Sequence, residues 1–196
     1  MTVLFAASAL FVVIHLALSG SGLRQQVVTT IGEGPYRLLF SVASGVCLFF
    51  MVAGYLEARH HNVLLWLEPE GARWLSLASN FFALILVTLG LTTPNPTLVM
   101  MDGLLERPEA AIGILRVTRH PMLVGQWLWS MTHVVVNGDL ASLVFFGAFV
   151  ITTTAGPFSI DRKISRRHPR AWPAFQRSTS IVPFAAILAG KNRLVL

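Results

Sequence analysis

The sequence predicts an all-α fold: a polytopic membrane helix bundle of about five transmembrane helices with a basic cytoplasmic C-terminal tail. Of its 196 residues, 54% are hydrophobic and only 12% are charged, about half the charged fraction of an average soluble domain. The apolar residues form blocks long enough to cross a hydrocarbon layer of ~30 Å as helices. The basic residues lie at the ends of these blocks and in the tail, which is typical of membrane topology.

Five apolar blocks are expected to be spans of one domain covering residues 1–196. Helices are expected because backbone polar groups in hydrocarbon need partners inside the protein. The first block has no basic start and no small-residue cleavage site, so we expect a retained span rather than a signal peptide. The spans are predicted at about residues 2–22, 36–56, 74–92, 120–136 and 140–158, and the tail at 159–196.

Turn and linker signals separate the blocks. The segment GLRQQVVTTIG after the first block reads as a short surface helix, and Pro94 and Pro96 follow the third block as helix breakers. The tripeptide 137–139, Asn-Gly-Asp, predicts a tight turn that makes the last two spans an antiparallel hairpin. In the tail, SIVPFAAILAG is too short to span and is expected to pack back under the bundle.

The basic residues also predict orientation. With five spans, 13 of the 15 Lys and Arg residues fall on the side that holds the tail. The positive-inside rule then places the N-terminus outside and the C-terminus in the cytoplasm. This distribution argues against nucleic acid as a partner, although the net charge is +6.

A polar stripe lies in the segment Arg116–Asp139. Gln126, Ser130, His133 and Asn137 follow one another at spacings of four, three and four residues, so on a helix they share one face. A polar stripe at membrane depth is costly unless it faces the protein interior. The stripe therefore indicates a pocket or a helix interface. His133 is either a structural histidine with a hydrogen-bond partner, a metal or haem ligand, or a proton carrier.

His15 is the only ionisable side chain in the first 23 residues, and it too is either a structural histidine or a ligand. Two histidines on different spans can hold one haem iron from both sides. Without a CxxCH motif, such a haem would be non-covalent haem b. The predicted depths differ, since His15 lies ~10 Å and His133 ~20 Å from the inner end at 1.5 Å per residue. Tilt or a longer first span has to close this gap.

A basic cluster precedes the fourth span. Arg116, Arg119 and His120 lie at the expected N-terminus of that helix, where an anion such as a haem propionate or a lipid phosphate can bind. The alternative is that they only begin the helix at the interface. Whether His120 replaces one of the two iron ligands is left open. Gln126 and Ser130 are candidates for the pocket lining.

Several blocks of sequence, covering nearly the whole chain, resemble a known family. They are RHPMLVGQWLWSMTHVVVNGDLASLVFFG, IDRK, TSIVPFAAILAGK, and the earlier HLALSGSGLR and GPYRLLFSVAS. The chain resembles the NnrU family of bacterial membrane proteins. More distantly, it is similar to the plant zeta-carotene isomerases, which share the RHP motif, the histidine thirteen residues later and a TSxxPFAAI tail.

The resemblance carries functional expectations. The NnrU family implies the bacterial inner membrane and a link to denitrification and nitric oxide metabolism. The plant isomerases imply haem b and redox-gated conversion of a 15-cis carotene bond to trans, with ligands at positions matching His15 and His133. A functional cysteine of those enzymes falls at Ser130, so thiolate ligation is not expected. An additional C-terminal span of those enzymes has no counterpart after the PFAAI motif.

We therefore expect haem b between the first and fourth spans, with His15 and His133 as iron ligands. Arg24, Arg37, Arg116 and Arg119 are candidate partners for its propionates. The expected role is redox or nitric-oxide-linked chemistry.

Three alternatives stay open. One is a haem-dependent cis–trans isomerase of a carotenoid-like polyene, and another is a cofactor-free membrane accessory protein. The third is an isoprenylcysteine-type methyltransferase, which is disfavoured because Asp161 stands alone among arginines. Membrane lipid is the expected partner, with a lipid-soluble small molecule if the protein is an enzyme.

Overall fold

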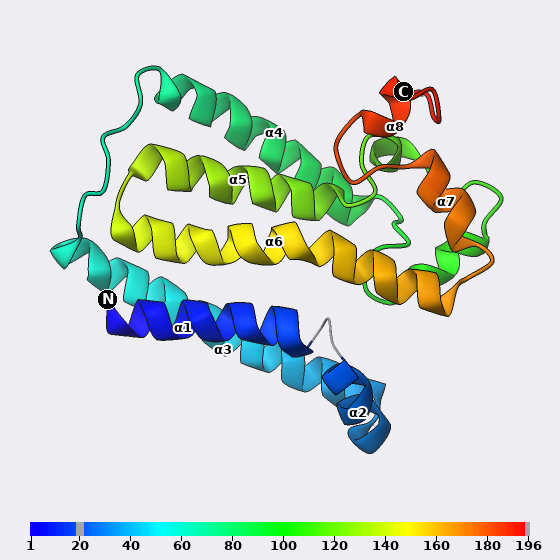
Figure 1. Cartoon of the computed structure of the whole chain (residues 1–196), viewed down its shortest axis with the longest axis horizontal. Coiled ribbons are helices and arrows are strands. Elements are labelled where there is room, and N and C mark those ends of the chain that lie inside the picture. The colour runs from blue at the N-terminus through cyan, green and yellow to red at the C-terminus, as the bar shows by residue number, and fades with distance from the viewer. Residues whose placement is uncertain (19–21, 195–196) are drawn as a thin grey trace. The chain divides into compact units, whose positions relative to one another are not determined.

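The structure, a computed structural model, describes residues 1–18 and 22–194, and it confirms the all-α prediction. Within these residues the regular structure is helical, with one isolated bridge between Leu64 and Asp139 (Figure 1). The longer helices are α1 (Thr2–Val13), α2 (Gly22–Ile31), α3 (Glu33–Ala58), α4 (Ala72–Thr92), α5 (Pro121–Asn137) and α6 (Leu140–Arg167). The short ones are η1 (Ile14–Leu18), η2 (Arg59–His61), η3 (Asp102–Glu106), η4 (Gly113–Arg116), α7 (Trp172–Ser178) and α8 (Ala185–Leu188).

The prediction of five spans is not confirmed. Among the described residues, three helical segments are long and apolar enough to cross a membrane: α3 with η2, α4, and α6. A fourth exists only if Thr2–Leu18 and Gly22–Ile31 count as one bent span. The fourth predicted block is helical, but α5 has only 17 residues, fewer than the ~20 that a span usually needs. Residues 19–21 of the first predicted span lie outside the described residues.

The chain divides into two compact units. Unit 1 comprises Met1–Ala78 and Trp129–Gly156, and unit 2 comprises Ser79–Leu128 and Pro157–Leu196. Helix α6 continues through Pro157 at the unit boundary. Such a proline lacks the N–H that would bond the carbonyl four residues earlier, but it is tolerated in membrane helices where neighbouring groups satisfy the backbone.

In unit 1, α1 lies beside α3 and runs in the opposite direction (Figure 1). Leu4 and Met51 are fully buried between these elements. A Cβ atom added at Gly54 would lie 2.8 Å from the backbone nitrogen of Leu4. This approach is one that only glycine permits, because the neighbouring atoms belong to the main chain and not to a flexible side chain. The small residue therefore brings the two helices together.

The predicted turn between the last two long helices is confirmed. Helix α5 ends at Asn137, α6 begins at Leu140, and Gly138 has φ of +65°. The carbonyl of Gly138 accepts hydrogen bonds from the backbone N–H groups of Leu65 and Trp66, at 2.8 and 3.0 Å. The loop after η2 is thereby fixed to the hairpin.

In unit 2, the C-terminal tail is bonded to the linker that precedes α5. The Arg119 N–H donates to the carbonyl of Ser180, and the Phe184 N–H donates to that of Val117, both at 2.9 Å. The Thr118 hydroxyl donates to the Ile181 carbonyl at 2.7 Å. These bonds agree with the expectation that SIVPFAAILAG packs back onto the protein. The predicted surface helix is also present as α2.

The α1–α3 crossing makes a testable prediction. Replacing Gly54 by Ala forces the new methyl group against the Leu4 backbone, so we expect a loss of roughly 1–3 kcal/mol of stability, as for other overpacked sites. Thermal unfolding of the detergent-purified variant, followed by tryptophan fluorescence, measures this loss. Gly45→Ala on the same helix is the control, since a Cβ at Gly45 meets nothing within 4 Å. Equal melting temperatures for both variants would contradict the close approach.

Candidate functional site

His15 lies in the π-helical turn η1, which continues α1. Its Nδ1 atom lies 2.8 Å from the carbonyl oxygen of Phe11, one turn earlier. The imidazole contacts the Phe11 ring at 4.0 Å and the Phe40 ring of α3 at 5.2 Å, measured between centroids. Single π-helical turns inside helices are uncommon and occur often at functional sites. The structure therefore gives His15 a distinctive backbone setting that composition alone did not reveal.

His133 repeats the same local arrangement in α5. Its Nδ1 lies 2.8 Å from the carbonyl oxygen of Trp129, again four residues earlier. The imidazole stacks on Phe146 of α6, with 4.6 Å between centroids and 26° between planes. The Trp129 ring lies 5.2 Å away. Both histidines thus have one nitrogen bonded to their own helix and two aromatic rings in contact with the imidazole.

These bonds assign the ring tautomers. A carbonyl oxygen can only accept, so Nδ1 must carry the hydrogen in both rings. In a neutral imidazole the basic lone pair then lies on Nε2. A hydrogen bond from Nδ1–H to a backbone carbonyl is the usual way in which proteins orient a histidine that ligates a metal through Nε2.

A shared aromatic cluster connects the two histidines within unit 1. Phe149 of α6 contacts Phe11 at 5.4 Å and Trp129 at 5.7 Å. Each histidine lies four residues beyond one of these two rings, which is ~6 Å of helical rise. Because α1 and α5 run in opposite directions (Figure 1), the two Cα atoms lie on opposite sides of the Phe149 level. By this rise the two Cα atoms lie ~12 Å apart in depth. Both imidazoles lean back toward the Phe149 level, but these contacts do not close the depth difference expected from the sequence.

The rest of the polar stripe divides between the two units. Ser130 is fully buried in unit 1, and Asn137 donates to the Ser142 hydroxyl at 2.9 Å. Ser142 also lies 3.1 Å from the Tyr55 hydroxyl, so this end of the stripe stabilises the hairpin. Gln126 belongs to unit 2, where it is half-buried.

Two of the four candidate arginines lie in unit 1, and they share one carboxylate. Arg24 and Arg37 pair with the same oxygen of Glu33, at 2.5 and 3.0 Å. The Arg24 guanidinium also lies over the Tyr36 ring, 5.2 Å from its centroid. The Tyr36 hydroxyl in turn donates to the carbonyl of Leu18, the last residue of η1, at 2.9 Å. Two cations and one anion are therefore held close to the turn that carries His15.

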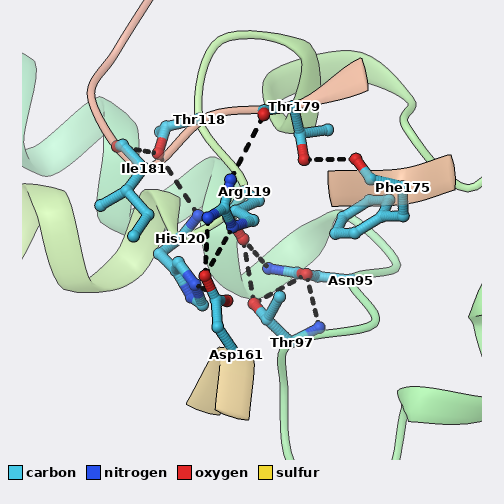
Figure 2. Close-up of polar contacts among 9 residues, drawn as sticks. All are labelled: Asn95, Thr97, Thr118, Arg119, His120, Asp161, Phe175, Thr179 and Ile181. Carbon is cyan, nitrogen blue, oxygen red and sulfur yellow. Dashed lines mark hydrogen bonds and ion pairs between the residues drawn. The ribbon is translucent and has the colours of Figure 1, made fainter. Parts of the chain in front are cut away.

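The other two arginines and His120 lie in unit 2, around a carboxylate that the sequence left without a role. Asp161 of α6 accepts from Arg119 Nε and Nη2 at 3.0 and 2.6 Å, and its second oxygen lies 2.8 Å from His120 Nε2 (Figure 2). All three side chains are largely buried. Burial lowers the pKa of His120, although the Asp161 carboxylate acts in the opposite direction. The ionised carboxylate can only accept, so His120 donates Nε2–H to it.

The same network reaches three further segments (Figure 2). Arg119 Nη1 donates to the carbonyl of Thr179 at 3.3 Å, and the Arg119 carbonyl accepts from the Thr97 hydroxyl at 2.9 Å. The Asn95 side chain accepts from the backbone N–H of Thr97 at 2.8 Å. The linker before α5, helix α6, the loop after α4 and the tail therefore meet at Arg119.

Arg116 is bound separately. It pairs with Glu109 and donates to the Asn192 side chain at 3.1 Å. Among the described residues, no three His, Cys, Asp or Glu side chains are grouped so as to hold a metal ion. A haem iron needs only two axial ligands from the protein, so the roles of His15 and His133 stay predictions.

The buried network makes a testable prediction. Asp161→Asn leaves the Arg119 cation without its carboxylate, and breaking a buried pair in this way costs roughly 3–5 kcal/mol. We expect a large drop in melting temperature and in expression level. Glu109→Gln is the matched control, because the Glu109 side chain is 63% exposed and an exposed pair contributes about 1 kcal/mol or less. Equal small losses in both variants would show that Asp161 does not hold unit 2 together.

Comparison with known proteins identifies the family. The family model described as "NnrU protein" matches residues 3–195. The chain is 27% identical over 202 residues to the chloroplastic 15-cis-zeta-carotene isomerase of Zea mays, covering 98% of the chain and 52% of that protein. It is 26% identical over 194 residues to the corresponding Arabidopsis thaliana protein, covering 94% of the chain and 50% of the relative. The chain thus spans about half the length of these relatives, and no solved structure matches it. The chain belongs to the NnrU family.

Proposed function

We propose that this protein holds one b-type haem in the membrane, in the aromatic cluster of unit 1, with His15 and His133 as the axial ligands. The observation that carries the proposal is the matched bonding of the two imidazoles. Each donates Nδ1–H to the carbonyl four residues earlier and so has its basic lone pair on Nε2, the nitrogen that ligates iron in this tautomer.

The surroundings of the two rings fit a flat apolar cofactor. Phe11, Trp129, Phe146 and Phe149 form a continuous set of ring contacts between the histidines. A porphyrin would pack against such rings, and His15 and His133 would hold its iron.

The charged groups favour one of the two arginine pairs as the partner of the haem propionates. Arg24 and Arg37 share a single carboxylate, Glu33, whereas Arg119 is already matched by Asp161 and Arg116 by Glu109. Arg24, Arg37 and Glu33 together therefore carry a net positive charge, and they lie in the same unit as the histidines. We assign the propionate role to Arg24 and Arg37 rather than to Arg116 and Arg119.

A bound haem would supply one-electron redox chemistry and a metal centre in a water-poor site. The protein's own part is to orient the two imidazoles, exclude water with the aromatic cluster and neutralise the acidic groups of the cofactor. The curated relatives are named as 15-cis-zeta-carotene isomerases, which favours cis–trans isomerisation of a lipid-soluble polyene as the activity. Redox chemistry linked to nitric oxide and denitrification is the second candidate, which the NnrU family suggests.

We also propose the bacterial inner membrane as the location, with the N-terminus outside and the C-terminus in the cytoplasm. The basic tail supports this orientation, since most of the Lys and Arg residues lie there or in loops assigned to the same side. Reporter fusions at the C-terminus test it.

The haem proposal predicts a specific result for variants. Titration of the detergent-purified protein with hemin should give a low-spin b-type absorbance spectrum in the oxidised and dithionite-reduced states. His15→Ala and His133→Ala should each abolish the low-spin spectrum and weaken hemin binding by roughly tenfold or more. His60→Ala is the control, because His60 is an exposed residue of η2, and it should bind hemin like the wild type.

Either of two results would overturn this assignment. A wild type that takes up no hemin would favour the cofactor-free accessory protein. Wild-type spectra in both histidine variants would move the ligands elsewhere in the chain.

The isomerase activity has its own test. Cells that accumulate 15-cis-zeta-carotene should form the 15-trans product when they express the wild type, and should fail to do so with His133→Ala at equal protein level. Hemin binding without any carotene conversion would instead favour the nitric-oxide-linked role, which consumption of nitric oxide by the reduced protein then checks.

A further inference from the structure

A cleft in unit 2 is lined by residues that belong neither to the histidine site nor to the Asp161 network. It has a volume of about 430 Å³ and lies where α4 ends and the following loop turns back. Apolar side chains form most of its wall, and one cation, Arg107, lines it. Its lining residues include Leu91, Met100, Met101, Gly103, Leu104 and Arg107. Helix α4 is one of the helices apolar enough to span. A spanning α4 would leave the hydrocarbon near its last residue and place the cleft beside the lipid headgroups.

The loop after α4 exposes two methionines, and one of them has a strained backbone conformation. Met100 has φ of +66°, a left-handed conformation that is rare for residues other than glycine. Its side chain is 76% exposed, so packing of that side chain does not explain the strain. Strained backbone of this kind concentrates at binding sites, and methionine adapts to irregular apolar ligands.

The charge of the cleft is positive. The neighbouring carboxylate, Asp102, is turned to another partner, because it accepts from His168 Nε2 at 3.1 Å and lies 3.5 Å from Arg167. Arg107 is exposed and is the only cation among the cleft's lining residues in the described part of the chain. An arginine beside an apolar wall at the membrane surface suits a phosphate attached to acyl chains.

We propose that this cleft binds the headgroup of an anionic membrane glycerophospholipid. The phosphate lies against Arg107, the first methylene groups lie along Leu91, Met101 and Leu104, and the acyl chains continue into the bilayer. The Leu89 carbonyl accepts from the Thr93 N–H at 2.9 Å. Helices generally leave their last carbonyls without intrahelical partners, which favours a headgroup that carries hydroxyl donors, as phosphatidylglycerol does.

Native mass spectrometry of the delipidated protein, titrated with phosphatidylglycerol, phosphatidylethanolamine or oleate, tests the proposal. The wild type should bind one phosphatidylglycerol more tightly than any further copy and more tightly than the other two lipids. Arg107→Gln should weaken this first binding about tenfold, the value of one charge-assisted hydrogen bond. Arg59→Gln is the matched control, because Arg59 is an exposed arginine of unit 1 and should leave binding unchanged.

A second variant separates the cleft from simple surface charge. A Cβ at Gly103 meets nothing within 4 Å, so Gly103→Leu should fold normally, fill the cleft and weaken the first phosphatidylglycerol without any change in charge. Full binding by Gly103→Leu would overturn the proposal, as would equal losses in Arg107→Gln and Arg59→Gln. Tighter binding of oleate than of phosphatidylglycerol would replace the phospholipid by a free fatty acid. None of these results depends on haem.

Discussion

The constraint on which this structure depends is that hydrocarbon offers no hydrogen-bond partner to a polar side chain. On α5 and in the turn after α1, the histidines have a partner within their own helix whatever their depth, because each donates to the carbonyl four residues earlier. The same solution recurs on α6, where the hydroxyls of Thr152 and Thr153 donate to carbonyls one turn back. For a hydroxyl this bond satisfies the side chain. For an imidazole the same bond also fixes the tautomer, because Nδ1 carries the hydrogen. The lone pair on Nε2 is then the one that can ligate a metal.

The two units use their polar groups differently. In unit 2, the carboxylate of Asp161 is engaged by both Arg119 and His120, and the arginine is engaged again by the tail. Such a network suits a structural junction, because its charges are matched and its members are buried. In unit 1, the imidazoles lie among aromatic rings, and the nearby arginines exceed the carboxylate that they share. The carboxylates of an anionic cofactor would neutralise this excess positive charge.

Local patterns in the sequence predicted the helices and the turn at Gly138, since each depends on residues within a few positions of one another. The ligand role of the two histidines stays a prediction. The pairing of Asp161 with Arg119 joins residues 42 positions apart, and nothing local indicated it; a lone acid among arginines was the one signal. The π-helical turn at His15 and the left-handed conformation of Met100 had no signal in the periodicity of the sequence. The five predicted spans are not confirmed, because apolar composition alone does not fix helix length, as the 17 residues of α5 illustrate.

The central claim is that two histidine nitrogens ligate one iron. Low-temperature electron paramagnetic resonance of the oxidised protein, purified from membranes of cells supplied with haem precursor, tests this most directly because the signal reports the axial ligands themselves. If His15 and His133 are the axial ligands, the wild type gives a low-spin ferric signal of the bis-imidazole type. A high-spin signal, or a low-spin signal of the thiolate type, would contradict the assignment of His15 and His133 as the axial pair.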